Sequence, residues 1–301
     1  AGMDRMGIVA AAFTHSSSDF GNLLSNTANK AMLRGAEEAD ETFQRWTRAG
    51  QLGDVKVASR VDLNEFPSLD KVAEGAEYKY ATLGDRGEQI QLATYGKLFS
   101  ITRQAIINDD LDAFTRIPGR MGRAALRTVG DLVYAVLSSN PTMSDGTALF
   151  HADHGNLLTA GGISTATVDA MRVALATQKG AGGSANLNIR LAHLLVPVAL
   201  EGAANVVRDS QFEVGASAKN NTTPNSVRGT FEVIADSRLD AAPTVWYGAA
   251  SAMLNDTIEV AYLDGNSMPV LEQQAGWNVD GVEFKVRMDA GVAPLDFRGL
   301  A

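Results

Sequence analysis

The clearest hydrophobic pattern in the chain is a run of apolar residues at helical spacing near its middle. Apolar side chains recur every three or four positions from Ile107 to Val136, the period of an amphipathic helix. Asn108-Asp109-Asp110 supplies an N-terminal cap, and Asn140-Pro141 ends the pattern. We expect Pro118-Gly119 to interrupt or kink this helix, because proline lacks a backbone donor. A helix of this length would cross an entire domain.

The first third of the chain has two contrasting patterns. Residues 1–30 are small and polar, which predicts an arm that becomes ordered on a neighbouring molecule. Apolar positions from Lys30 to Trp46 then predict a short amphipathic helix. Extended segments at 55–63, 78–83 and 89–102 are joined by turn residues, which predicts a long β-hairpin. Its tip would be charged, with Asp85, Arg86 and Glu88.

Helices and strands mix in the part that follows the long helix. Helices are expected at 165–177 and 199–207, and strands at 190–196, 231–235, 244–247, 258–263 and 282–287. These elements do not follow the regular strand-helix-strand alternation of a parallel sheet. The pattern therefore predicts the α+β class, with no internal repeat.

Composition limits the function classes. The 301 residues are 45% hydrophobic, which is enough to bury a core, and 35 acidic against 26 basic residues give a net charge of −9. This charge argues against sequence-specific binding of nucleic acid, although an acidic inner surface can surround DNA without binding it. With no cysteine, disulfides, thiol catalysis and cysteine-based zinc sites are excluded.

No targeting segment is recognisable. The sequence has no apolar run of about 18 residues and no basic segment followed by an apolar one, so we expect a soluble protein without a secretory signal. The sequence begins Ala1-Gly2, which either removal of an initiator methionine or cleavage of a longer precursor would explain.

One cluster has the residue types of a metal site. His151, Asp153 and His154 lie close enough in sequence to share an ion. A closed site needs a fourth ligand, but His15 falls in the polar arm and His193 in an apolar strand. Loop side chains that bond to the backbone are the favoured interpretation, and no metal or cofactor is assigned.

Two further motifs have the appearance of catalytic or cofactor sites. The glycine-rich stretch from Gly180 to Ala185 follows a helix and precedes a strand, the reverse of the order in a dinucleotide-binding fingerprint. His15, Asp19 and the serines at 16–18 are contiguous in a polar arm and cannot hold the geometry of a hydrolase triad. The sequence therefore predicts no catalytic residue and no enzyme.

Three motifs carry a resemblance to a known family. They are Leu149–Leu157 just after the long helix, Leu194–Pro197 before a helix, and Asp289–Val292 with Asp296–Gly299 near the end. With the order arm, hairpin, long helix and mixed half, the chain resembles the Hong Kong 97-type capsid fold of tailed phages. Within that fold it is most similar to the major head subunit of Mu-like phages, whose closing segment has a glycine turn and a short final strand.

The resemblance implies a domain organisation. It places an N-terminal arm and short helix at 1–54, a hairpin called the E-loop at 55–102, and an axial domain at 161–255. The peripheral domain, built on the long spine helix, takes 103–160 and 256–301. Some relatives join neighbouring subunits through a lysine and an asparagine, but Lys71, Lys79 and Lys97 are interpreted here as solvated residues of the hairpin.

The resemblance also implies a function. It is that of a major capsid protein, which assembles with copies of itself through pentamers and hexamers into an icosahedral shell around phage DNA. Assembly would occur in the host cytoplasm, with scaffold, portal and decoration proteins as further partners and no membrane. The alternatives are the shell protein of an encapsulin-type nanocompartment and, less favoured, a metal-dependent α+β enzyme that uses His151, Asp153 and His154.

Overall fold

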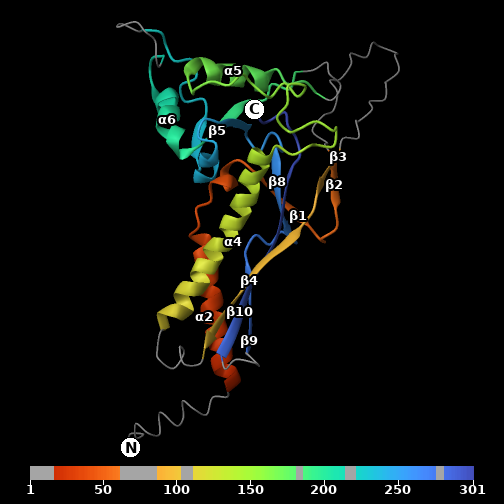
Figure 1. Ribbon diagram of the computed structural model, residues 1–301, viewed down its shortest axis with the longest axis vertical. Helices are drawn as coiled ribbons and strands as arrows, with labels where there is room; N and C mark the ends of the chain where they lie inside the picture. Colours follow the sequence, from red (N-terminus) through yellow and green to blue (C-terminus); the bar gives the residue numbers. More distant parts are fainter. Residues whose placement is uncertain (1–16, 62–86, 103–110, 181–185, 214–221, 276–280) are drawn as a thin grey trace, which may run out of the picture. The chain divides into compact units, whose positions relative to one another are not determined.

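The computed structural model describes residues 17–61, 87–102, 111–180, 186–213, 222–275 and 281–301 (Figure 1). The chain divides into two compact units. One contains residues 1–41, 93–129 and 266–290, and the other contains residues 42–92, 130–265 and 291–301. Both units combine helices with strands, so the predicted α+β class is confirmed.

The first unit combines helices with antiparallel strands. Its elements are α2 (Ser17–Glu37), the first part of α4 (Leu111–Ser139), β4 (Ala93–Thr102), β9 (Val270–Ala275) and most of β10 (Gly281–Pro294). The central strand is β10, which pairs with β4 on one side and β9 on the other. Phe284 of β10 is buried against Ala28 of α2, so the small residues of this helix cover the sheet.

Glycines let α2 and α4 approach each other very closely. A side-chain carbon added at Gly122 would overlap the carbonyl oxygen of Met32, and one added at Gly35 would overlap the backbone of Gly119. The two helices lie side by side in Figure 1. Because the backbones themselves are in contact, this packing depends on the absence of side chains at these positions.

The described strands of the second unit pair in three groups. Parallel pairing joins β1 (Arg48–Leu52) to β8 (Ile258–Leu263), and antiparallel pairing joins β2 (Ala58–Val61) to β3 (Gly87–Ile90). In the third sheet β5 (Leu191–Val196) lies between β6 (Glu232–Ala235) and β7 (Tyr247–Ala250). The helices of this unit are η1 (Thr42–Arg45), the end of α4, α5 (Thr165–Ala176), η2 (Val198–Leu200), α6 (Glu201–Asp209) and η3 (Ser237–Ala241).

One core cluster of the second unit lies between α5, α6 and β5. Val168 and Leu175 of α5, Leu194 of β5 and Val207 of α6 are at most 1% exposed. Ser164 begins α5 with a capping box, because its hydroxyl accepts from the Thr167 amide while the Thr167 hydroxyl accepts from the Ser164 amide. The helices predicted at 165–177 and 199–207 are thus confirmed, with small shifts at their ends.

The long helix is confirmed as α4, and it continues through Pro118, so the expected interruption is wrong. The helix ends at Ser139, directly before the predicted stop at Asn140-Pro141. The proposed cap, Asn108-Asp109-Asp110, lies outside the described residues. Contact with α2 on the glycine face supplies stabilisation that helical propensity alone does not predict.

The short helix expected from Lys30 to Trp46 is wrong in both boundaries. The helix α2 begins at Ser17, within the segment predicted to be an arm, and ends at Glu37. Phe43 and Trp46 belong instead to the second unit, where Trp46 packs against Tyr134 with ring centroids 6.0 Å apart. Met32, Phe43 and Trp46 lie at helical spacing in the sequence, but Met32 belongs to the first unit and the other two belong to the second. The single helical pattern was therefore only apparent.

The hairpin prediction holds only at its base. The strands β2 and β3 pair in antiparallel register, while residues 62–86, which include the predicted tip residues Asp85 and Arg86, lie outside the described part. The expected strand at 89–102 is divided, and its second half, β4, pairs with β10 instead of with a hairpin partner. Pairing between segments so distant in sequence is decided by tertiary structure.

The glycine turn expected near the end of the chain lies at Gly299, where the Leu300 amide donates to the Phe297 carbonyl oxygen at 3.0 Å and Leu300 then pairs with Ala249. Gly291 lies inside β10, where an added side-chain carbon would overlap the carbonyl oxygen of Gln91. The strand is therefore longer than the predicted 282–287, and its glycine is needed for close approach of two backbones. The strands β1 and β9 were not predicted, and the strand expected at 244–247 occurs later, as β7.

We predict that Gly122→Ala lowers the free energy of unfolding by about 1–3 kcal/mol, because the new methyl group must separate α2 from α4. The matched control is Gly202→Ala in α6, where nothing lies within 4 Å of the added carbon. This control should change stability by less than about 1 kcal/mol. Urea unfolding followed by circular dichroism measures both. Equal midpoints for the two variants would contradict the close helix contact.

Candidate functional site: the loop after the long helix and the closing segment

Asn140 closes the loop that follows α4. Its backbone takes a positive φ of 48°, and its side-chain amide pairs with the backbone of Phe150, accepting from the amide at 2.7 Å and donating to the carbonyl at 3.1 Å. Asparagine tolerates this left-handed conformation better than most residues do. The loop therefore returns to the end of the helix that it leaves.

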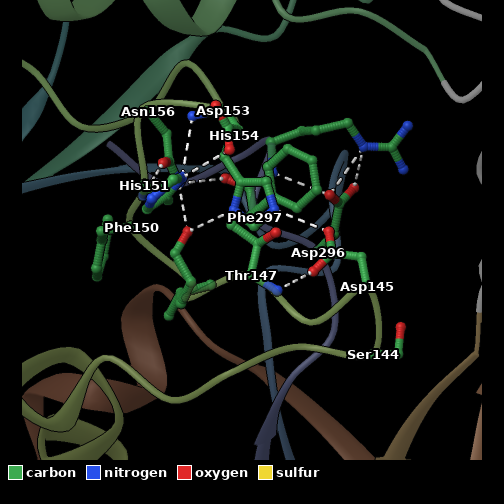
Figure 2. Close-up of polar contacts among 12 residues, drawn as sticks. Ser144, Asp145, Thr147, Phe150, His151, Asp153, His154, Asn156, Asp296 and Phe297 are labelled. Carbon is green, nitrogen blue, oxygen red and sulfur yellow. Dashed lines mark hydrogen bonds and ion pairs between the residues drawn. The ribbon is translucent and has the colours of Figure 1, made fainter.

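The imidazole of His154 fills the interior of this loop. It is 6% exposed, with Nδ1 3.1 Å from the Leu149 carbonyl oxygen and Nε2 2.8 Å from Oδ2 of Asp145. Both ring nitrogens therefore face oxygen atoms of the same loop. The ring also stacks on Phe297, with centroids 3.8 Å apart and planes inclined by 5° (Figure 2).

Asn156 forms a second link to the closing segment of the chain. It is 1% exposed, and its Oδ1 accepts from the His151 amide at 3.0 Å. Its Nδ2 donates to the carbonyl oxygens of Leu149 and Phe297, at 2.8 and 3.4 Å. One buried side chain thus satisfies backbone groups from both segments, which would be costly to leave unpaired.

The closing segment is itself buried and paired. The Nε of Arg298 donates to both carboxylate oxygens of Asp296, at 2.8 and 3.0 Å, and the two side chains are 2% and 4% exposed. Ala301 exchanges two backbone hydrogen bonds with Gly248 of β7, and Gly299 accepts from Ala250. The last residues therefore pair with β7 at the edge of the sheet formed by β5, β6 and β7.

Glu88 connects this loop to β3. Its buried carboxylate accepts from the Ser144 amide with both oxygens, at 3.1 and 3.2 Å, and from the Ser144 hydroxyl at 2.6 Å. A carboxylate held by several donors in a buried site is a fixed structural element. Predicted as part of an exposed hairpin tip, Glu88 is 9% exposed and anchors the base of the hairpin.

The three residues proposed as metal ligands do not converge. His151 is half-exposed and lies 3.3 Å from Asp153, whereas the ring of His154 points inward to Asp145 and Phe297. In the ranges that the structure describes, no group of three histidine, aspartate or glutamate side chains is placed to hold a metal ion.

The other candidate residues are dispersed. Ser17, Ser18 and Asp19 begin α2, while His15, Ser16, Lys71, Lys79 and residues 181–185 lie outside the described part. His193 lies in β5, where burial lowers its pKa and nearby Glu232 opposes that shift. Lys97 is exposed on β4. None of the described helices combines the length and apolar character that crossing a membrane requires.

Sequence reasoning missed most of the residues that build this site. Asn140 was identified only as a helix end, and Asn156 and Phe297 only as parts of motifs. The signal for Asp145 was its Asp-Gly pair, typical of a turn. No signal indicated that the Leu149–Leu157 motif and the closing segment contact each other.

Solved structures with a similar fold include several from phages, one of them a procapsid. A Microbacterium phage Oxtober96 chain matches with a TM-score of 0.54 and 10% identity, covering 85% of each chain. A Mycobacterium phage Adephagia chain matches with a TM-score of 0.54 and 14% identity, covering 85% of this chain and 84% of that chain. The bacteriophage JBD30 procapsid matches with a TM-score of 0.50 and 14% identity, covering 94% of this chain and 74% of that chain. The fold is the Hong Kong 97-type capsid fold.

Sequence comparison gives the particular family. A family model described as phage capsid protein matches residues 87–301, which include the whole loop and the closing segment. The chain belongs to this phage capsid family. No sequence among curated proteins matches it significantly. It is a structural protein of the virion, a major capsid protein that forms an icosahedral shell.

We predict that His154→Ala lowers the free energy of unfolding by about 3 kcal/mol, because it removes a buried ring together with two hydrogen bonds. The matched control is His151→Ala, three residues earlier, whose half-exposed ring should contribute less than about 0.5 kcal/mol. Thermal unfolding of both variants provides the measurement. A similar loss for the two histidines would show that burial in the loop is not the cause.

Proposed function

We propose that this capsid protein assembles through pentamers and hexamers, and that the closed shell encloses double-stranded phage DNA without sequence-specific binding. The observation that carries the proposal is the family match over residues 87–301, joined to a capsid fold over most of the chain. Scaffold, portal and decoration proteins are further proposed partners, with assembly in the host cytoplasm. The Leu149–Leu157 motif supports a place near the Mu-like head subunits.

The parts of the chain are proposed to have separate roles in assembly. Residues 161–255 would form the axial domain, supported by a core cluster whose buried members lie between Val168 and Phe231, with the addition of Ala301. Residues 103–160 and 256–301 would form the peripheral domain around α4. Within the hairpin region, 55–102, the stretch between β2 and β3 would be the part that contacts neighbouring subunits, because β4 pairs with β10.

Apolar side chains on the surface support self-association. Met253 is 97% exposed, Leu254 79% and Leu98 73% in the isolated chain. Exposed apolar groups of this size favour burial against another molecule, at about 25 cal/mol per Å² before entropic costs. Many modest contacts of this kind, repeated around closed rings, give a durable shell without any single strong contact.

The first test is negative-stain electron microscopy of the purified protein, paired with light scattering for its mass in solution. We expect closed shells, or rings of five and six subunits. Shells that carry DNA or a portal would support the phage role, whereas shells loaded with a cargo enzyme would support the nanocompartment alternative. A monomer or dimer that persists across salt and protein concentration would contradict the proposal.

A second prediction concerns the first sixteen residues, which we propose contact neighbouring subunits. Deleting residues 1–16 leaves α2 intact, so the subunit should keep its circular dichroism spectrum and its unfolding midpoint. The shells should nevertheless form in lower yield, measured by sedimentation of assembled particles. Shells in normal yield from the shortened chain would refute a role for this segment.

A further inference from the structure

Arg60 and Glu88 lie directly opposite each other in the pairing of β2 with β3. Opposing residues of an antiparallel pair point to the same face, so both charged side chains lie on one side of the hairpin base. Each is bonded to a different element of the second unit: Arg60 to Glu259 of β8, and Glu88 to Ser144 in the loop after α4. We call these four residues the base clamp.

The Arg60 half of the clamp is a complete guanidinium–carboxylate pair. Its Nε lies 3.2 and 3.1 Å from the two carboxylate oxygens of Glu259, and its Nη2 donates to Oε1 at 2.5 Å. The same Nη2 donates to the Gln51 carbonyl oxygen in β1 at 2.9 Å. The side chain of Glu259 is 3% exposed and that of Arg60 33%. A planar guanidinium held at several points fixes direction as well as distance, so β2 is held to both β1 and β8.

A glycine in β1 leaves room for this carboxylate. A side-chain carbon added at Gly50 would overlap Oε1 of Glu259. The overlap is with the end of a side chain, whereas the pairing of β1 with β8 is made by the backbone. Gly50→Ala should therefore displace the carboxylate from Arg60 while it keeps both charged residues and the strand pairing.

The neighbouring pair of the hairpin base is apolar. Ala58 lies opposite Ile90, which is 1% exposed within a core cluster of the second unit. Ser59 and Gln89, on the opposite face, are exposed. The apolar pair anchors the base of the hairpin in the core. The charged pair is the next one toward the stretch between β2 and β3, so it controls the direction in which the chain continues.

The energetics of the clamp indicate positioning more than stability. Removing a carboxylate and a guanidinium from water costs free energy that their mutual attraction only partly returns, and apolar side chains in the same place are often equally stable. A fixed, multiply bonded pair does, however, select one geometry. Two such contacts on one side of the hairpin, to separate elements, select one direction for it.

We propose that the base clamp presets the direction in which the hairpin leaves the subunit, and that assembly depends on this direction. The inference rests on the proposed function, in which the stretch between β2 and β3 contacts neighbouring subunits. Arg60 and Glu259 act as positioning residues, because their effect on a neighbour passes through the hairpin. A segment that is already oriented loses less entropy on binding, so a clamped hairpin joins a growing shell more readily than a mobile one.

The first test measures the direction of the hairpin base in the free, full-length subunit. Since the sequence has no cysteine, Gln89→Cys on β3 and Val173→Cys on α5 give two defined sites for spin labels, both exposed and in the same unit. Double electron–electron resonance reports the distance between the labels. We expect one narrow distance distribution in this background, and a broader one when Arg60→Gln or Gly50→Ala is added.

The matched control is Arg48→Gln, which removes an arginine of β1 that is ion-paired with Asp256 and has no place in the clamp. It should leave the distance distribution and the yield of shells unchanged. Arg60→Gln and Gly50→Ala should each lower the yield of closed shells, measured by sedimentation, by about tenfold. Circular dichroism checks that each variant is folded; if Arg60→Gln unfolds, Gly50→Ala carries the comparison.

A double variant separates positioning from stability. Arg60→Met with Glu259→Met replaces the ion pair by apolar side chains, so the unfolding midpoint should stay near that of the wild type. The proposal expects this variant to keep a broad distance distribution and a low yield of shells. Recovery of a narrow distribution and of normal assembly would instead reduce the ion pair to a stabilising contact and overturn the proposal.

Other results would also overturn it. An unchanged distribution in both Arg60→Gln and Gly50→Ala would show that the apolar pair alone sets the direction. A normal yield of shells despite a broadened distribution would show that assembly does not depend on the direction, and an equal loss in Arg48→Gln would remove the specificity. If the wild type itself formed no shells, the proposed function would fail, while the distances in the free subunit would still report on the clamp.

Discussion

The stack of the His154 ring on Phe297 is the contact on which the end of the chain depends. It joins the loop after α4 to the closing segment, and the Asn156 amide repeats that link through the Phe297 carbonyl oxygen. Glu88 extends the same loop to β3 through Ser144. A hairpin base, a helix end and the closing segment are thus held by a few buried polar side chains, each of which would be costly to leave unpaired.

Backbone contact between α2 and α4 imposes a second constraint. Since glycines at Gly35, Gly119 and Gly122 hold these helices together, one face of α4 is committed to packing. Packing against α2 also explains how α4 continues through Pro118, because tertiary contact can offset a missing backbone hydrogen bond.

Both features fit a protein whose work is done by assembly. Polar links fix the position of each segment within the subunit, while exposed apolar residues such as Met253 and Leu254 are left for other molecules to cover. The histidine that first suggested a metal site is a structural residue of this framework. Its partners are a carbonyl, a carboxylate and an aromatic ring, which orient the loop.

The sequence by itself determined the elements with strong local signals. The apolar period predicted α4, and the Asn140-Pro141 pair predicted where it ends; the helix α5 and the strand β8 were found in the same way. Only the tertiary structure decided that β4 pairs with β10, that Phe43 and Trp46 leave the pattern begun by Met32, and that His154 meets Phe297. Periodicity reports which face of one segment is apolar, whereas the partner of that face is chosen by the packing of the whole chain.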